Sequence, residues 1–248
     1  MNFVKFTCAL ILFASSSLLN AEWNPKYLPV ENQSVLGRLK NPSLIQLENQ
    51  VFESVKNSWC SEEKAKLLME LVVLTQPGVC VEIGAFTGSS SLPLLAALKH
   101  VGSGRAYIID AWSNAEAVRG LTTEDPNTVW WAGLDMKAVK NQFLHMLNLW
   151  SLTSYCKILS TTSQKAVLRI PTIDFIHIDG NFSAEGALLD SELYLPKVVP
   201  GGYVLLSNAL VMIGGKPTKM KALWPIFDQC DIVCELEYGN TLLFRKKL

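Results

Sequence analysis

The chain has 248 residues with 22 basic and 22 acidic side chains, so its formal net charge is zero. This balance argues against a protein that holds nucleic acid mainly by charge, because such a protein needs a basic excess or a basic patch. Hydrophobic residues make up 49% of the chain and charged residues 18%, the opposite of a disordered composition, so we expect a globular protein of enzyme size.

Residues 1–21 have the order of a secretory signal. Lys5 precedes an uncharged run over 6–19, and Ala21 stands at a plausible cleavage position. The run is shorter than the roughly 20 apolar residues that a membrane-spanning helix needs, and no second candidate span follows it. We therefore predict export to the periplasm or the cell exterior. The alternatives are an uncleaved leader that anchors the protein and a cytoplasmic protein in which this segment packs as an amphipathic helix.

The predicted elements then alternate along the chain. A polar lead-in and a helix over 43–56 fill residues 22–60, and a second helix over 61–75 begins with Ser61 as its N-cap. Apolar strands interleaved with helices predict parallel strands with both sheet faces covered, in one doubly wound α/β domain over 61–248. The expected strands are 79–83, 105–110, 155–159, 173–179 and 203–206, and the expected helices are 89–100, 136–150 and 184–195.

The C-terminal part has a different pattern. Residues 230–237 and 241–245 flank a Tyr-Gly-Asn turn and predict a hairpin that closes the sheet edge antiparallel. Cys230 and Cys234 are expected on one face of the first hairpin strand, about 13 Å apart and beyond disulfide reach. The basic runs 216–221 and 245–247 are expected to be solvated surface, and Pro200-Gly201-Gly202 is expected to be a turn.

The strand-to-helix turn after residue 82 carries the first chemical signal. Its spacing is Glu-x-Gly-x-x-x-Gly, with Glu82, Gly84 and Gly88, and it lacks the middle glycine of a dinucleotide fingerprint. A carboxylate beside this turn suits a cationic ligand, such as an amino group beside a sulfonium, better than a diphosphate. The alternative is an ordinary turn without a ligand.

Asp110 and Trp112 carry the second signal. Asp110 closes the strand that should neighbour the first, where one carboxylate can accept two hydrogen bonds from a ribose diol. Trp112 could then cover the adenine or the ribose. The alternative is that Asp110 only caps a loop.

His177 and Asp179 carry the third signal. Strand alternation places both side chains on one side, with Asp179 at the carboxyl end of the strand, facing the cleft. The next strand ends in Ser207-Asn208, which should lie beside Asp179. Either His177 or Asp179 could act as a general base. The alternatives are a histidine packed in the core and an acid tied to loop amides.

Together these motifs resemble the class I S-adenosylmethionine-dependent methyltransferases, in particular the group with Ile-His-Ile-Asp-Gly in its fourth strand, followed by Asn-His-Ser-Tyr. The resemblance covers about residues 62–248 and implies a Rossmann-like seven-stranded sheet of order 3-2-1-4-5-7-6 with the last strand antiparallel. It implies S-adenosylmethionine as cofactor and places Asp179 at the methyl-transfer centre, with His177 as the second catalytic candidate. The implied cofactor-binding residues are Glu82, Gly84, Ala85, Phe86, Gly88, Ser89, Asp110, Ala111, Trp112, Ser160, Thr161 and Asp179.

The sequence departs from the resembled pattern where metal-assisted members gather carboxylates. Ser207-Asn208 stands where an acidic pair is usual, and Phe182 and Ala184 replace the His and the Tyr. A hard dication prefers several anionic oxygens, and Asp179 alone offers one such group. We assign no metal ligand. A divalent metal stays an alternative, because Asn208 could add an amide oxygen.

We therefore predict an enzyme that methylates a small-molecule acceptor, most simply at a hydroxyl of a sugar or a polyketide-like compound, without a nucleic-acid partner. Residues 111–133, with Trp130 and Trp131, are expected either to cover the acceptor as a lid or to anchor the next helix. The alternative function is a non-catalytic, exported or surface-associated protein that binds the cofactor. A nicotinamide-dependent dehydrogenase is disfavoured by the glycine spacing and the terminal hairpin.

Overall fold

The computed structural model describes residues 42–123, 126–213 and 216–248. The predicted signal at 1–21 and the lead-in up to residue 41 lie outside the described residues. Within the described ranges, no helix is both long enough and apolar enough to cross a bilayer.

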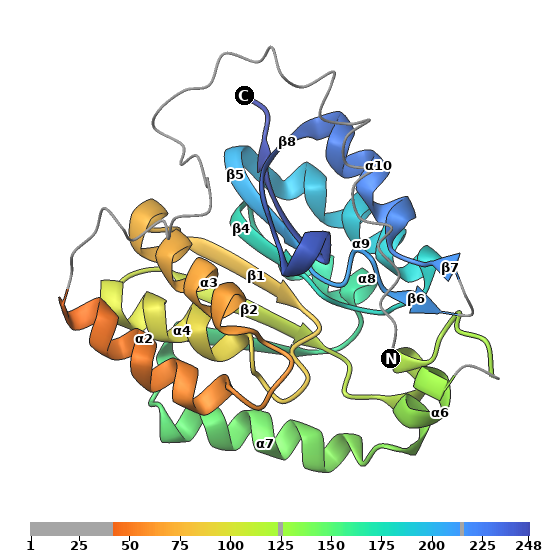
Figure 1. Ribbon diagram of the computed structural model, residues 1–248, viewed down its shortest axis with the longest axis horizontal. Helices are drawn as coiled ribbons and strands as arrows, with labels where there is room; N and C mark the ends of the chain where they lie inside the picture. Colours follow the sequence, from red (N-terminus) through yellow and green to blue (C-terminus); the bar gives the residue numbers. More distant parts are fainter. Residues whose placement is uncertain (1–41, 124–125, 214–215) are drawn as a thin grey trace.

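A seven-stranded sheet forms the centre of the molecule, in the order β3-β2-β1-β4-β5-β9-β8 (Figure 1). The first five strands in chain order run parallel, and β9 pairs antiparallel with both β5 and β8. The predicted strand order and the predicted terminal hairpin are therefore confirmed. The strands are β1 (Val79–Ile83), β2 (Arg105–Asp110), β3 (Cys156–Ser160), β4 (Ile173–Ile178), β5 (Val198–Leu206), β8 (Cys230–Leu236) and β9 (Thr241–Lys246).

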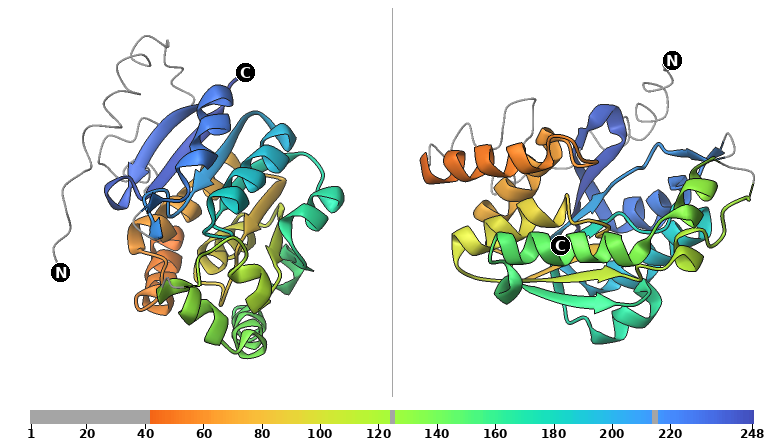
Figure 2. Two further views of the ribbon diagram at one scale, coloured as in Figure 1. Left: turned by 90° about the vertical axis from the view of Figure 1, so that its right-hand side faces the viewer. Right: turned by 90° about the horizontal axis from the view of Figure 1, so that it is seen from below.

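Helices cover both faces of this sheet (Figure 1 and Figure 2). Because strand side chains alternate, β1 contributes Cys80 to one buried cluster and Val81 and Ile83 to the other. The first cluster packs under α2 (Pro42–Val55), α3 (Glu62–Thr75), α4 (Ser91–Val101) and α7 (Met136–Leu149). The second packs under α8 (Ser163–Ala166), α9 (Ala184–Tyr194) and α10 (Met220–Gln229).

Short elements connect these layers. The N-cap predicted for α3 is confirmed, since the Ser61 hydroxyl accepts a hydrogen bond from the backbone amide of Lys64. Two short helices, α5 (Asn114–Ala117) and α6 (Pro126–Gly133), follow β2. The remaining elements are the 3-10 turns η2 (Thr153–Tyr155), η3 (Val167–Arg169), η4 (Leu195–Lys197) and η5 (Glu237–Gly239), and the two-residue strands β6 (Met212–Ile213) and β7 (Lys216–Pro217).

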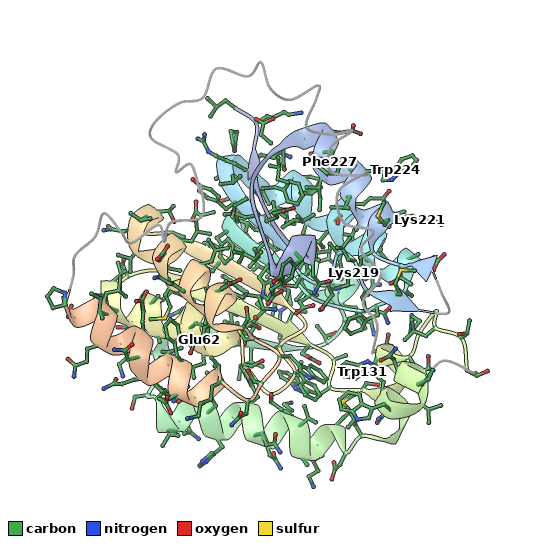
Figure 3. All side chains as sticks on the ribbon, viewed as in Figure 1. Glu62, Trp131, Lys219, Lys221, Trp224 and Phe227 are labelled. Carbon is green, nitrogen blue, oxygen red and sulfur yellow. The ribbon has the colours of Figure 1, made fainter. Side chains whose placement is uncertain are left out.

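The prediction that residues 216–221 form a solvated basic run is wrong for Lys219. This side chain is only 1% exposed, at the start of α10, which the sequence reading did not predict. Figure 3 shows Lys219 toward the middle of the molecule and Lys221 on the outer side of the same helix, where it is exposed. Helical periodicity turns the two lysines in different directions, so a run of like charges need not share one environment.

Two irregularities in the sheet correct two further predictions. The pairing of β4 with β5 shifts between Ile173 and Phe175, so Pro200-Gly201-Gly202 bulges within β5 instead of forming a turn before it. A second shift lies in the pairing of β8 with β9, between Ile232 and Cys234, where β8 carries an extra residue.

Because of this extra residue, Cys230 packs in the second cluster and Cys234 in the first, and the prediction of a shared face is wrong. The described cysteines, Cys60, Cys80, Cys156, Cys230 and Cys234, are all free thiols.

Candidate active site

A cavity of about 900 Å³ opens at the carboxyl ends of β1, β2 and β4. In this sheet the strand order reverses between β1 and β4, which is where doubly wound folds bind their ligands. Its walls come from the β1–α4 turn, the loop after β2 with α5 and α6, the β3–α8 turn, and the loops that follow β4 and β5.

The β1–α4 turn touches the end of β4 directly. A Cβ atom on Gly84, which has φ of +90°, would lie 2.1 Å from the carbonyl oxygen of Asp179. The Asp179 amide in turn donates to the Ile83 carbonyl at 2.9 Å. Only glycine fits this approach, so the turn and the Asp179 backbone form one wall. Gly88 has a different role, because a Cβ there would collide with Met146 of α7 at 2.4 Å.

Glu82 lies beneath the turn and is fully buried. Its carboxylate accepts hydrogen bonds from the hydroxyls of Ser90, at 2.6 Å, and Ser91, and it lies 3.1 Å from Nδ1 of His177. These partners satisfy the carboxylate inside the protein. Glu82 thus ties the turn to β4 and does not reach the cavity surface.

Asp110 is held by backbone amides on both of its oxygens. Oδ2 accepts from the Phe86 amide at 2.9 Å, and Oδ1 accepts from the Trp112 amide at 2.7 Å. Burial raises the pKa of Asp110, while these amide hydrogen bonds oppose the rise. A carboxylate can accept about four hydrogen bonds, so Asp110 caps its loops and keeps capacity for a ligand diol in the cavity that it lines.

The backbone around Asp110 is strained for bulky residues. Phe86 has φ of 50° and Trp112 has φ of 42°, both in the left-handed region. The indole Nε1 of Trp112 donates to the Phe86 carbonyl at 2.9 Å and locks the two loops together. Strain of this kind, compensated by hydrogen bonds, is common at ligand sites.

His177 is fully buried near the carboxyl end of β4. Its Nδ1 faces Glu82, and its Nε2 lies 2.8 Å from the Ser207 hydroxyl. Both ring nitrogens therefore have partners within the protein, an arrangement that favours the packed histidine over the general base.

Asp179 reaches the cavity and keeps 18% of its side chain exposed. Its Oδ1 accepts a hydrogen bond from the Asn208 amide at 2.6 Å, which confirms that the ends of β4 and β5 lie side by side. Asn208 adopts φ of 59°, a left-handed conformation that asparagine tolerates better than most residues. On the other side, Oδ2 lies 4.0 Å from Nε2 of His177, beyond hydrogen-bond distance.

Lys219 joins this group from α10, and the sequence analysis missed it. Its Nζ lies 3.4 Å from Oδ1 of Asp179 and donates to the Ser207 carbonyl at 3.1 Å. The ammonium also lies 4.9 Å from the ring centre of Phe182. Burial lowers the pKa of Lys219, and the charge and hydrogen bond of Asp179 counteract that effect. A lysine in a basic run carries no sequence signal of burial.

Five aromatic rings form one side of the cavity, and we call them the aromatic wall. Trp59 stacks on Phe86, with ring centres 5.0 Å apart and planes inclined by 13°. Trp131 meets the edge of Phe86 at 5.4 Å and lies 5.9 Å from Phe182. Such a surface suits a flat, apolar molecule. The wall consists of Trp59, Phe86, Trp130, Trp131 and Phe182.

Two asparagine amides hold the segment that was predicted as a lid or an anchor. Asn114 donates to the carbonyls of Trp131 and Leu134, both at 2.9 Å. Asn181, after β4, donates to the Glu116 carbonyl at 2.8 Å. The described residues of this segment therefore form a hydrogen-bonded part of the cavity wall, with Trp131 in the lining.

The residues around Asp179 do not suit a divalent metal. Within the described ranges, no group of three or more His, Cys, Asp or Glu side chains is arranged to hold an ion. Oδ1 of Asp179 already faces two nitrogen donors, those of Asn208 and Lys219. A dication would have to approach a buried ammonium, which its charge opposes.

The structure thus brings together most, not all, of the predicted site residues. Those that line the cavity are Gly84, Ala85, Phe86, Ser89, Asp110, Ala111, Trp112, Thr161 and Asp179. Glu82, Gly88 and His177 lie behind the lining, and the Ser160 hydroxyl accepts from Nζ of Lys140 at 2.8 Å outside it. Lining residues that the sequence analysis did not single out include Trp59, Lys64, Asn181 and Asp190.

Comparison with known proteins places this chain in a family. A sequence model described as a methyltransferase domain matches residues 81–209, just over half of the chain. The chain belongs to the class I S-adenosylmethionine-dependent methyltransferases. This confirms the family inferred from the motifs. A search of curated proteins finds no match.

Solved structures of O-methyltransferases share the methyltransferase fold. TomG from Streptomyces achromogenes, in complex with S-adenosylmethionine, is 14% identical, with a TM-score of 0.56 over 84% of this chain and 90% of that chain. An O-methyltransferase from Bacillus cereus, in complex with S-adenosylhomocysteine, is 13% identical, with a TM-score of 0.54 over 85% and 93%. NovP is 14% identical, with a TM-score of 0.58 over 75% and 79%.

Proposed function

We propose that the protein transfers the methyl group of S-adenosylmethionine to a hydroxyl of a small-molecule acceptor. One observation carries this proposal: the β1–α4 turn, Asp110 and Asp179 converge on a single cavity at the reversal point of the sheet. Its volume of about 900 Å³ is at the upper end of ordinary ligand sites, enough for a nucleoside cofactor and a small acceptor together.

On the cofactor side, Asp110 would accept the two ribose hydroxyls with the hydrogen-bonding capacity that its backbone partners leave. Gly84, Ala85 and Ser89 would surround the methionine part. Trp112 and Thr161 would lie near the ribose and the adenine, and Ala111, which stands between Asp110 and Trp112 in the chain, would line the same side of the cavity. Bound there, the cofactor supplies a methyl group on a sulfonium, whose sulfur is a good leaving group because it departs as a neutral thioether. The protein therefore has to align the acceptor and manage one proton.

On the acceptor side, the aromatic wall favours an acceptor with a flat, apolar ring over a free sugar. Asp179 is the proposed general base, because its Oδ2 has no hydrogen-bond partner within reach in the described structure and its side chain reaches the cavity. Oδ2 would take the hydroxyl proton as the acceptor oxygen attacks the methyl carbon. His177 and Glu82 would position the ends of β1 and β4 beneath it.

Calorimetry and radiolabelled transfer together test this function. We expect the full chain to bind S-adenosylmethionine and S-adenosylhomocysteine, and to pass label to phenols more readily than to sugars. Absence of cofactor binding by a folded protein would contradict the proposal. Binding without transfer to any acceptor in a broad screen would favour the alternative, a non-catalytic protein that keeps the cofactor pocket.

We also propose that residues 1–21 direct export, on the basis of the sequence pattern alone. Mass spectrometry of the amino terminus of the protein from its native cell is the direct test. A mature chain that begins at or near residue 22 supports the proposal. A chain that still begins at residue 1 contradicts cleavage, and fractionation would then distinguish an anchored protein from a cytoplasmic one.

A further inference from the structure

Lys219 is a buried cation in contact with the proposed base. It is 1% exposed and enters from α10, forty residues after Asp179 in the sequence. Within the described part of the chain, its polar and aromatic contacts are the carboxylate of Asp179, the carbonyl of Ser207 and the ring face of Phe182. Each is a partner that a buried ammonium can use: an anion, a hydrogen-bond acceptor and a π face.

Two physical effects oppose a lysine at this position. Burial removes the hydration of the ammonium, which is costly for an unpaired charge. In addition, Lys219 is the N-cap residue of α10, and the positive end of a helix disfavours a cation. The pairing with Asp179 must therefore offset both costs. A hydrophobic side chain would fill the same space without either cost. This suggests that the charge itself has a role.

We propose that the Lys219 ammonium is a built-in cation that takes the place of a divalent metal on the acceptor side of the cavity. This inference rests on the proposed function, because it concerns how the same site handles the acceptor proton. Lys219 is a positioning residue: it acts through Asp179 and does not line the cavity itself.

The geometry explains how this arrangement would work. Lys219 and Asn208 both hold Oδ1 of Asp179, which leaves Oδ2 turned to the other side, where the described residues offer it no hydrogen-bond partner. The fixed positive charge stabilises a negative charge at this end, whether it rests on Asp179 or, after proton transfer, on the acceptor oxygen. The negative charge on the acceptor oxygen disappears only when this oxygen gains the methyl group.

The local charge balance supports a monovalent cation. At the ends of β4 and β5, Asp179 supplies the carboxylate in contact with Lys219, while Asn208 and Ser207 supply only neutral groups. Farther away, Asp190 and Lys64 act on Lys219 with one charge of each sign, so they balance each other. One ammonium neutralises one carboxylate, and a dication would leave an excess positive charge. Phe182 and Ser207, two of the positions at which the sequence departs from the metal-assisted pattern, are both contacts of Lys219.

The test compares metal dependence in the wild type and in matched variants. We expect methyl transfer by the full-length wild type to be unchanged by EDTA. The Lys219→Met variant should lose about tenfold or more in kcat, with the affinity for S-adenosylmethionine nearly unchanged. Lys221→Met, on the exposed side of α10, is the control and should leave both quantities unchanged. Wild-type transfer that EDTA abolishes and Mg²⁺ restores would overturn the inference.

Binding of Mn²⁺, followed by electron paramagnetic resonance, gives a second readout that needs no activity. Lys219→Ala combined with Asn208→Asp removes the ammonium and adds a second carboxylate, so this double variant should bind Mn²⁺ at least about tenfold more tightly than the wild type. Equal Mn²⁺ affinities of the wild type and the double variant would overturn the inference. A wild type that does not bind S-adenosylmethionine would contradict the proposed function instead, and the Mn²⁺ comparison would still test Lys219.

Discussion

Two carboxylates end strands on either side of β1, and the protein holds them in different ways. Asp110 is fixed by the backbone amides of Phe86 and Trp112, from the two loops that follow β1 and β2. Asp179 is fixed by the side chains of Asn208 and Lys219, which come from the end of β5 and from α10. Both lie in one cavity, where they occupy the proposed cofactor and acceptor sides.

This difference indicates which side of the site is more sensitive to amino-acid substitutions. A carboxylate held by backbone amides needs only the local turn geometry, so its partners survive most substitutions of side chains. A carboxylate held by side chains depends on the identity of residues far away in the sequence. We therefore expect the cofactor side to be common to many relatives of this fold, and the acceptor side to be particular to this chain.

The largest effect should come from removing the charge that Lys219 needs. Asp179→Asn leaves a fully buried ammonium without the carboxylate that it contacts, with only the more distant charge of Asp190 to compensate. Breaking a buried pair in this way costs about 3–5 kcal/mol of unfolding free energy. Urea denaturation measures the change. The double variant Asp179→Asn with Lys219→Met is the control and should recover much of the loss. An Asp179→Asn variant as stable as the wild type would show that the pair contributes nothing.

A third acid, Asp190, lies under the loop that carries Asp179, and its titration should govern stability in mild acid. Burial raises the pKa of Asp190 from 3.8 to about 6. The folded state therefore binds more protons than the unfolded state between these values, and stability falls as the pH rises from about 4 to about 6. The free energy of unfolding should fall by about 3 kcal/mol in total over this pH range.

The variant Asp190→Asn isolates this titration from that of Asp110, whose pKa burial also raises. Because asparagine does not ionise, the variant should lack the part of the pH slope that belongs to Asp190. Thermal unfolding of both proteins at a series of pH values measures the difference. If stability changed with pH in the same way in the wild type and in the Asp190→Asn variant, the raised pKa of Asp190 would be contradicted.

A smaller effect is expected on the cofactor side. Asp110→Ala removes the proposed acceptor of the ribose hydroxyls and should weaken S-adenosylmethionine binding by about 2 kcal/mol. Calorimetry measures the affinity, and circular dichroism checks that the variant is folded, since the amides of Phe86 and Trp112 also lose their partner. Unchanged affinity in a folded variant would contradict the ribose assignment.

The smallest effect should come from the edge of the aromatic wall. Trp59 is 60% exposed and stacks on Phe86, so Trp59→Ala should weaken binding of a planar acceptor by about 1 kcal/mol, with cofactor affinity unchanged. The KM for the acceptor measures this. Trp224 is 72% exposed on α10, away from the cavity lining, and Trp224→Ala is the matched control. Equal effects of the two substitutions would argue against a role of the wall in acceptor binding.

Much of the fold was predictable because its signals are local. The apolar run before Gly84 predicts a buried strand, the following glycines predict a close turn, and the Tyr-Gly-Asn segment predicts the terminal hairpin. Each signal depends on a few consecutive residues, where period and turn chemistry act directly. The bulges in β5 and β8 were missed, because an extra residue in a strand is defined by its partner strand.

The sequence by itself determined the class of fold, the family and the strand ends that carry Asp110 and Asp179, because hydrophobic period and motif spacing are properties of contiguous segments. Only the tertiary structure decided that Lys219 pairs with Asp179, that Trp59 joins the aromatic wall, and that Glu82 and His177 lie behind the cavity. These contacts join residues from separate elements. Their energies depend on burial and distance, which a chain acquires only when its layers pack.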